Sequence, residues 1–142
     1  MAHANQFTKL TDAERFFYYH AGFSYDPKIE TRQQRKLRCA REMADAEAYA
    51  RRAGWTFSWF DDWQFNHTKE YGREYEPQTC ECCQLQDADG EVLESLCCID
   101  DADANYRRVI EAELADQALY SIRKAEARDA QLKQFVNVSY AL

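Results

Sequence analysis

Glycine and proline are scarce in this chain of 142 residues, which has four glycines and two prolines. So few turn-forming residues favour one compact, helix-rich domain with few tight turns. No apolar run approaches the ~20 residues that a membrane-spanning helix needs. The first residues, MAHANQFTKLTDAE, contain no apolar stretch like that of a secretory signal. We therefore expect a single soluble domain in the cytoplasm, with no membrane partner.

The chain also lacks the sequence patterns of common catalytic sites. It has no G-x-S-x-G nucleophile elbow, and its four scattered glycines cannot form a phosphate-binding loop. The three histidines, His3, His20 and His67, have no partner at the spacing that acid–base chemistry would require. We predict no catalytic residues, no cofactor and no enzymatic activity.

Hydrophobic periodicity and capping residues predict helices near both ends of the chain. Thr11 and Glu14 have capping-box spacing, which predicts an aromatic helix over 11–20. A second helix over 31–53 begins at Thr31 and ends before Gly54. A last helix begins at 103 and either continues to Phe135 or breaks near Arg128 into an amphipathic tail, so that a tail after 128 is an alternative.

Three strands lie between these helices. Aromatic residues alternate along 55–60, and residues 64–79 are polar and are expected to form a long surface loop. The predicted sheet therefore spans 55–99. The order ααβββα predicts an α+β fold, with a three-stranded antiparallel meander and helices packed on one face.

The segment Asp87-Ala-Asp-Gly90 predicts a hairpin between 80–86 and 91–99. A three-residue loop places Leu85 opposite Leu93 and Cys83 opposite Ser95. A four-residue loop places Leu85 opposite Val92. We prefer the three-residue loop.

Charge is distributed very unevenly along the chain. The stretch 61–103 has thirteen carboxylates against Lys69 and Arg73, a net charge of −11 in a chain whose total is −7. Such an asymmetry indicates a partner with a basic surface. The carboxylates are Asp61, Asp62, Glu70, Glu74, Glu76, Glu81, Asp87, Asp89, Glu91, Glu94, Asp100, Asp101 and Asp103.

The six cysteines include a C-x-x-C pair, Cys80 and Cys83, and the adjacent residues Cys97 and Cys98. Together with His67 these cysteines offer candidates for the four ligands of a zinc site. A vicinal pair on a strand fits such a site poorly. We interpret most cysteines as reduced, buried apolar residues, with a metal-binding module as the alternative. The aspartates at 61–62 and 100–103 offer oxygen ligands for a divalent cation, although a helix cap explains the second group better.

Seven of the ten residues from Phe16 to Tyr25 are aromatic or histidine. One interpretation is that they dock the first helix onto the sheet. The other is an aromatic anchor patch for a partner, formed by Phe16, Tyr19 and Tyr25.

The order α-βββ-α is also that of the double-stranded RNA-binding fold, which places lysines at the start of its last helix. This chain has Asp100, Asp101 and Asp103 there, and these would repel phosphates. We therefore expect no direct binding to nucleic acid.

Three segments resemble small uncharacterised proteins of bacteriophages and mobile elements. They are TDAERFFYYHAGFSYDP at 11–27, CAREMADAEAYARRAG at 39–54, and DADGEVLESL at 87–96 with IDDA at 99–102. The resemblance covers most of the chain through Leu114. It implies an inhibitor of host defence, since small acidic phage proteins without enzymatic motifs often have that role, some by imitating the charge of DNA.

Our leading hypothesis is therefore a non-enzymatic protein of anti-CRISPR or anti-restriction type. Its acidic face would bind a basic groove of a host protein that handles nucleic acid. The residues expected to bind are Asp61, Asp62, Asp87, Asp89, Asp100, Asp101 and Asp103. The alternatives are a zinc or magnesium module and a structural protein that dimerises through its long terminal helix.

Overall fold

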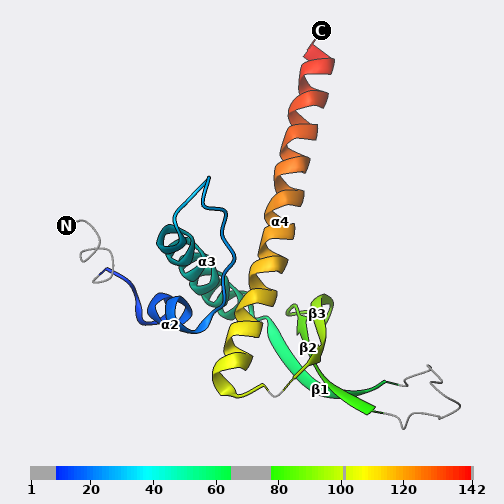
Figure 1. The fold of residues 1–142 in the computed structure, drawn as a ribbon. Coiled ribbons are helices and arrows are strands. Elements are labelled where there is room, and N and C mark those ends of the chain that lie inside the picture. The colour runs from blue at the N-terminus through cyan, green and yellow to red at the C-terminus, as the bar shows by residue number, and fades with distance from the viewer. Residues whose placement is uncertain (1–8, 65–77, 101, 142) are drawn as a thin grey trace, which may run out of the picture.

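The structure is a computed structural model that describes residues 9–64, 78–100 and 102–141. The fold is α+β with the element order ααβββα, as predicted. The three strands form an antiparallel sheet in the order β1-β2-β3, with the helices on one side of it (Figure 1). The elements are α2 (Asp12–His20), α3 (Arg32–Ala53), β1 (Thr56–Gln64), β2 (Gln78–Gln86), β3 (Val92–Ile99) and α4 (Ala104–Ala141).

Both shorter helices begin with a capping box. The Thr11 hydroxyl accepts a hydrogen bond from the Glu14 amide at 3.2 Å, and the Glu14 carboxylate accepts one from the Thr11 amide at 3.3 Å. Thr31 and Gln34 form the same reciprocal pair at 3.1 and 2.9 Å. These bonds satisfy backbone donors that have no partner within the helix, which explains why α2 and α3 begin where they do.

The main core lies between the sheet and the helices. Cys83 and Leu85 of β2 are completely buried and pack in one cluster with Ile110 and Leu114 of α4. Small residues of α3, such as Ala46, complete the cluster, since they allow the two helices to approach closely. The side of the sheet that carries Cys83 and Leu85 therefore faces α4.

The first helix packs against the other helices. Phe17 is fully buried in a second cluster with Ala40 and Met43 of α3 and Val109 of α4. The predicted docking of this aromatic helix onto the sheet is therefore wrong. Helices α4 and α3 already cover the side of the sheet that faces the helices. The apolar residues of α2 therefore pack on these two helices and not on the sheet.

The hairpin forms as predicted and its tip has the register of the preferred three-residue loop, but the predicted pairs of Leu85 with Leu93 and of Cys83 with Ser95 do not form, and the four-residue alternative is wrong. Gln86 pairs with Val92 and Leu85 pairs with Glu94, so the register shifts by one residue between these two pairs. The bulge has a physical reason: it leaves Leu93 free to pack against the main core on the same side as Leu85.

The hairpin loop has the preferred length of three residues, 88–90, because Asp87 and Glu91 face each other across it. The Asp87 amide donates to the Glu91 carbonyl at 2.8 Å. The Asp87 carboxylate accepts hydrogen bonds from the amides of Asp89 and Glu91, both at 2.9 Å. These bonds hold the three-residue loop together.

Strands β1 and β2 extend into the segment that was predicted to be a loop. Trp63 pairs with Thr79 and Gln64 pairs with Gln78, so the interval between the strands is 65–77, which lies outside the described residues. Polar residues can continue a ladder because backbone groups make its hydrogen bonds. The prediction of a loop over all of 64–79 is therefore wrong at both of its ends.

The last helix is unbroken for 38 residues, from Ala104 to Ala141. It begins where it does because the Asp103 carboxylate accepts a hydrogen bond from the Tyr106 amide at 2.8 Å, as an N-cap does. Its first half lies on the sheet and α3, and its second half extends away from them (Figure 1). In the described ranges, no helix is both long enough and apolar enough to cross a membrane.

Candidate partner-binding surface

One end of the sheet gathers acidic residues from all three strands. Asp61 pairs with Glu81, and Glu81 pairs in turn with Ile99, which Asp100 follows. Antiparallel pairing places these positions in one row across the strands, about 4.8 Å from strand to strand. We call the resulting group the acidic end of the sheet; it comprises Asp61, Asp62, Glu81, Asp100 and Asp103.

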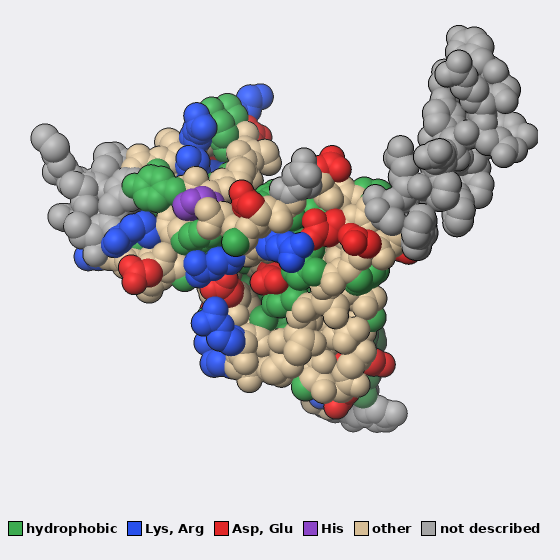
Figure 2. Space-filling view, turned by 90° about the horizontal axis from the view of Figure 1, so that it is seen from below, with side chains coloured by type: hydrophobic (Ala, Val, Ile, Leu, Met, Phe, Trp, Pro, Cys, Tyr) green, Lys and Arg blue, Asp and Glu red, His purple; other side chains and the backbone are tan. Residues whose placement is uncertain are grey.

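Three of these five carboxylates are free to meet a partner. Asp61, Asp62 and Asp100 are exposed, and none of them forms an ion pair with a residue in the described ranges. The other two have structural partners, since Glu81 accepts from Arg107 and Asp103 caps α4. Figure 2 looks onto this end of the molecule, with acidic side chains near the centre and right and most basic ones to the left.

The remaining predicted acidic residues lie elsewhere. Asp87 and Asp89 belong to the hairpin loop, which is at the other end of the sheet because Gln86 pairs with Thr56. Seven strand positions separate Cys80, the partner of Asp62, from Asp87, which corresponds to roughly 20 Å. Charges so far apart are screened from one another at physiological salt. Asp101, also predicted, lies outside the described residues.

The three aromatic residues predicted to bind a partner have different environments. Phe16 is partly buried, its ring stacks on His20 with 4.3 Å between centroids, and the Arg108 guanidinium lies 4.3 Å above it. Phe16 is therefore part of the packing between α2 and α4. Tyr19 and Tyr25 have exposed fractions of 67% and 46%. They lie on α2 and in the loop before α3, away from the acidic end of the sheet.

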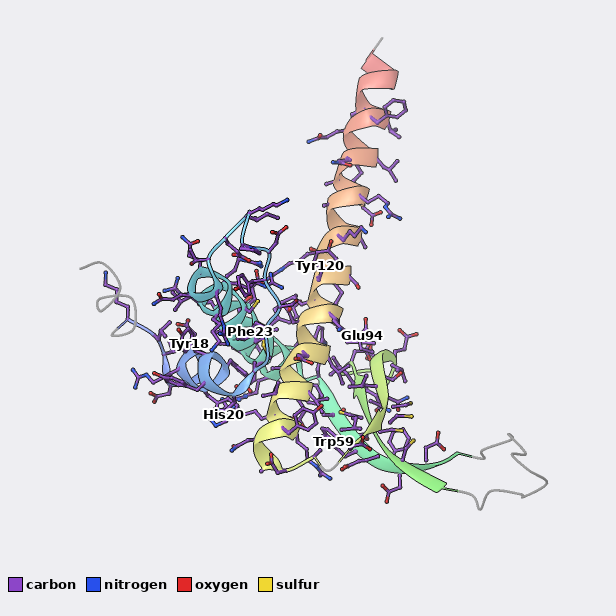
Figure 3. The ribbon with its side chains drawn as sticks, viewed as in Figure 1. Tyr18, His20, Phe23, Trp59, Glu94 and Tyr120 are labelled. Carbon is purple, nitrogen blue, oxygen red and sulfur yellow. The ribbon has the colours of Figure 1, made fainter. Side chains whose placement is uncertain are left out.

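A network that sequence reasoning missed supports the acidic end of the sheet. The Trp59 indole donates to the Glu111 carboxylate at 2.8 Å, and Arg107 lies 4.7 Å above the Trp59 ring while it also donates to Glu81. Figure 3 shows Trp59 in the space between the sheet and the start of α4. The available signal was the i, i+4 spacing of Arg107 and Glu111, which places both on one face of the helix.

The cysteines of the hairpin are free thiols, and two of them are core residues. Cys82 and Cys83 have exposed fractions of 1% and 0% on opposite sides of the sheet. Burial raises the pKa of Cys82 to about 12, with hydrogen bonds between its thiol and those of Cys97 and Cys80 as further causes, and burial also raises the pKa of Cys83 to about 12. Among residues 9–64, 78–100 and 102–141, no group of three candidate ligands is arranged to hold a metal ion. His67 lies outside these ranges.

A second acidic site lies between α3 and α4 and involves residues from outside the acidic stretch. Glu42, Glu113 and Asp116 line an open pocket of about 210 Å³, and the loop before α3 forms part of its wall. Burial raises the pKa of Glu113, and the charge of Asp116 adds to the effect. Burial and the charge of Glu42 raise the pKa of Asp116. Helical periodicity alone did not reveal this site, because its members come from two helices that are far apart in the sequence.

The acidic end of the sheet is thus the best-defined candidate surface. It combines exposed charges of one sign with strands that hold them in fixed positions. Comparison with protein-family models, with curated proteins and with solved structures finds no match to this chain.

Proposed function

We propose that this chain is a non-enzymatic binding protein whose acidic end of the sheet docks on a basic surface of another protein. The observation that carries the proposal is the exposure of Asp61, Asp62 and Asp100, none of which forms an ion pair with a residue in the described structure. Charges on a protein surface are usually interspersed in sign, so an uncompensated group raises the local negative potential. A partner with lysines and arginines would gain from contact with it.

The partner's surface is of the kind that binds nucleic acid. Duplex DNA carries one negative charge per ~1.7 Å of its axis, and its binding proteins neutralise several phosphates at once. The carboxylates at the strand ends also present several negative charges in fixed positions. They would occupy part of a basic groove and exclude DNA from it.

The class of partner rests on the resemblance of three segments to small phage and mobile-element proteins. It leads us to propose a host defence protein of CRISPR or restriction type, met in the cytoplasm of the host cell. In this role the chain acts as an inhibitor and makes no contact with nucleic acid itself. The acidic residues at the start of α4 support this, since they would repel a phosphate backbone.

The test is capture of bacterial proteins on the immobilised full chain at low and at high salt. We expect a retained protein that is released by salt and by added duplex DNA, because both compete for the same basic groove. The triple variant Asp61→Asn, Asp62→Asn, Asp100→Asn should lose this protein.

The matched control removes the same charge at the other end of the sheet. Asp89→Asn, Glu91→Gln and Glu94→Gln change three carboxylates of the hairpin and should leave capture unchanged. Equal losses in the two triple variants would show that total charge alone governs binding. Retention that neither salt nor DNA reverses would overturn the proposal.

A further inference from the structure

No described element of the chain covers the second half of α4. Its last polar contact to another described element is the ion pair of Arg123 with Asp45 of α3, at 3.3 Å. Beyond it, side chains 124–137 are all exposed. Figure 3 shows Tyr120 near the point where the helix leaves the body of the molecule. About half of a 38-residue helix therefore extends alone.

This extension carries large apolar side chains that a lone helix would leave in water. Leu132, Phe135 and Val136 have exposed fractions of 56%, 70% and 47%. In proteins most of the stability of a helix comes from packing of its apolar face, and an unsupported helix is marginally stable. The composition of the extension therefore indicates a packing partner.

Four apolar residues and Asp129 form a narrow seam with alternating spacings of three and four residues, and Phe135 lies beside it. This spacing is the pattern of a two-helix coiled coil. The seam also continues the face of α4 that Ala115 and Ala118 bury against the core. Its members in the extension are Ile122, Ala125, Asp129, Leu132 and Val136.

We propose that this seam binds a second copy of the chain in an antiparallel two-helix coiled coil. Residues 125–136 of one copy lie along residues 136–125 of the other. This register places Ala125 opposite Val136 and Asp129 opposite Leu132. Ala125 thus packs against the larger Val136. Each Asp129 lies against Leu132 of the other copy and not against the other Asp129.

In the antiparallel orientation, the residues beside the seam of one copy have favourable partners beside the seam of the other copy. In an antiparallel pair, Glu126 of each copy lies beside Lys133 of the other, and Arg128 lies beside Phe135, where a cation–π contact can form. A parallel pair would place Asp129 against Asp129 and Arg128 against Lys133, which are both repulsive. The antiparallel orientation thus places Glu126 beside Lys133 and avoids both like-charge contacts of the parallel pair, and this complementarity identifies the second copy as the occupant.

The test is the mass of the full chain in solution, measured by sedimentation equilibrium under reducing conditions over a wide range of concentration. We expect a concentration-dependent increase from 16.7 kDa to twice that mass. Leu132→Asp should weaken the dimer at least about a hundredfold, since each copy loses a buried leucine. Because Leu132 lies outside both core clusters, the variant should keep the near-ultraviolet circular dichroism that arises from the aromatic residues of the folded body.

A charge reversal distinguishes the two orientations. In the antiparallel pair, Lys133→Glu places a second carboxylate beside Glu126 and should weaken the dimer roughly fivefold to tenfold. In a parallel pair, the same change places a carboxylate beside Arg128 and would strengthen the dimer. Adding Glu126→Lys to Lys133→Glu should restore the wild-type dissociation constant. Lys124→Glu makes the same change of charge away from the seam and should have no effect.

Three results would overturn this proposal. The first is a wild-type chain of 16.7 kDa at every concentration. The second is a dimer that Leu132→Asp does not weaken, which would place the contact elsewhere. The third is a dimer that Lys133→Glu strengthens.

Discussion

Arg108 links three helices through a single side chain. From α4 it donates to both carboxylate oxygens of Glu47 on α3 at 2.9 Å, and its guanidinium lies 4.3 Å above the ring of Phe16 on α2. The bidentate geometry fixes the helices relative to one another, and Glu47 is well protected from water, with an exposed fraction of 16%. The ion pair of Arg108 with Glu47 should therefore contribute more to the free energy of unfolding than an ordinary surface ion pair does.

We predict that Arg108→Met lowers the free energy of unfolding by about 2 kcal/mol, because it leaves a partly buried carboxylate without its main partner. Urea denaturation measures this difference. Arg51→Met is the matched control, since Arg51 also contacts Glu47, at 3.3 Å, but is 77% exposed. Arg51→Met should change the free energy of unfolding by no more than about 0.5 kcal/mol. Equal losses would show that the geometry around Arg108 has no special value.

The thiols of the hairpin should differ in reactivity. Cys97 is exposed, whereas Cys82 and Cys83 are buried and have pKa values of about 12. The thiolate is the reactive form, so we predict that iodoacetamide at pH 8 modifies Cys97 in the folded chain and leaves Cys82 and Cys83 intact. Mass spectrometry of peptides measures this order, with the urea-unfolded chain as the control. Early modification of Cys83 would contradict the described core.

Asp116 should make stability depend on pH. Burial and the charge of Glu42 raise its pKa above the usual 3.8, so the folded chain holds a proton that the unfolded chain has already released. Stability therefore falls as the pH rises through the window between the usual and the raised pKa. We predict that Asp116→Asn stabilises the chain at pH 7 by about 0.5 kcal/mol and that this gain disappears below pH 3.8.

Thermal unfolding at a series of pH values measures this effect. A gain for Asp116→Asn that persists at low pH would show that charge is not its cause.

At the scale of the elements, Gly54 shows how a single residue ends a helix. It has a φ of 73°, and its amide donates to the carbonyl of Arg51 at 3.4 Å. We predict that Gly54→Ala destabilises the chain by about 1 kcal/mol, because an alanine is strained at this φ. The nearest side-chain atom would be 3.7 Å from the new methyl group, so crowding adds nothing.

Gly22→Ala is the control for this change. No atom lies within 4 Å of its added methyl group, and its φ is not in the left-handed region. Urea denaturation should show that Gly22→Ala is neutral or slightly stabilising. A similar loss of stability at both positions would show that the positive φ of Gly54 is not the cause of the effect.

Local sequence signals predicted the elements well where the physics is local. Thr11, Thr31 and Gly54 marked helix ends because their hydrogen bonds and dihedral angles involve residues within four positions. The register of the hairpin could not be predicted in the same way. The bulge at Leu93 depends on the contact of that residue with the core, which brings together elements that are distant in the sequence. The same reason explains why the aromatic helix packs on α3 and α4.

At the scale of the whole molecule, the acidic stretch divides into two groups. An antiparallel hairpin sends consecutive carboxylates to opposite ends of the sheet, so Asp61 and Asp100 lie at the same end whereas Asp87 and Asp89 lie roughly 20 Å away. Counting charges along the chain could not reveal this division. It also could not reveal Arg107, whose contact with Glu81 crosses from α4 to the sheet.

The central claim is that the acidic end of the sheet occupies a surface that otherwise binds nucleic acid. The most direct measurement is a competition assay in which the captured partner binds fluorescent duplex DNA and the full chain is titrated in. We predict complete displacement of the DNA, weakened at least about tenfold by the triple change of Asp61, Asp62 and Asp100 to asparagine. A ternary complex of partner, DNA and chain would contradict the claim.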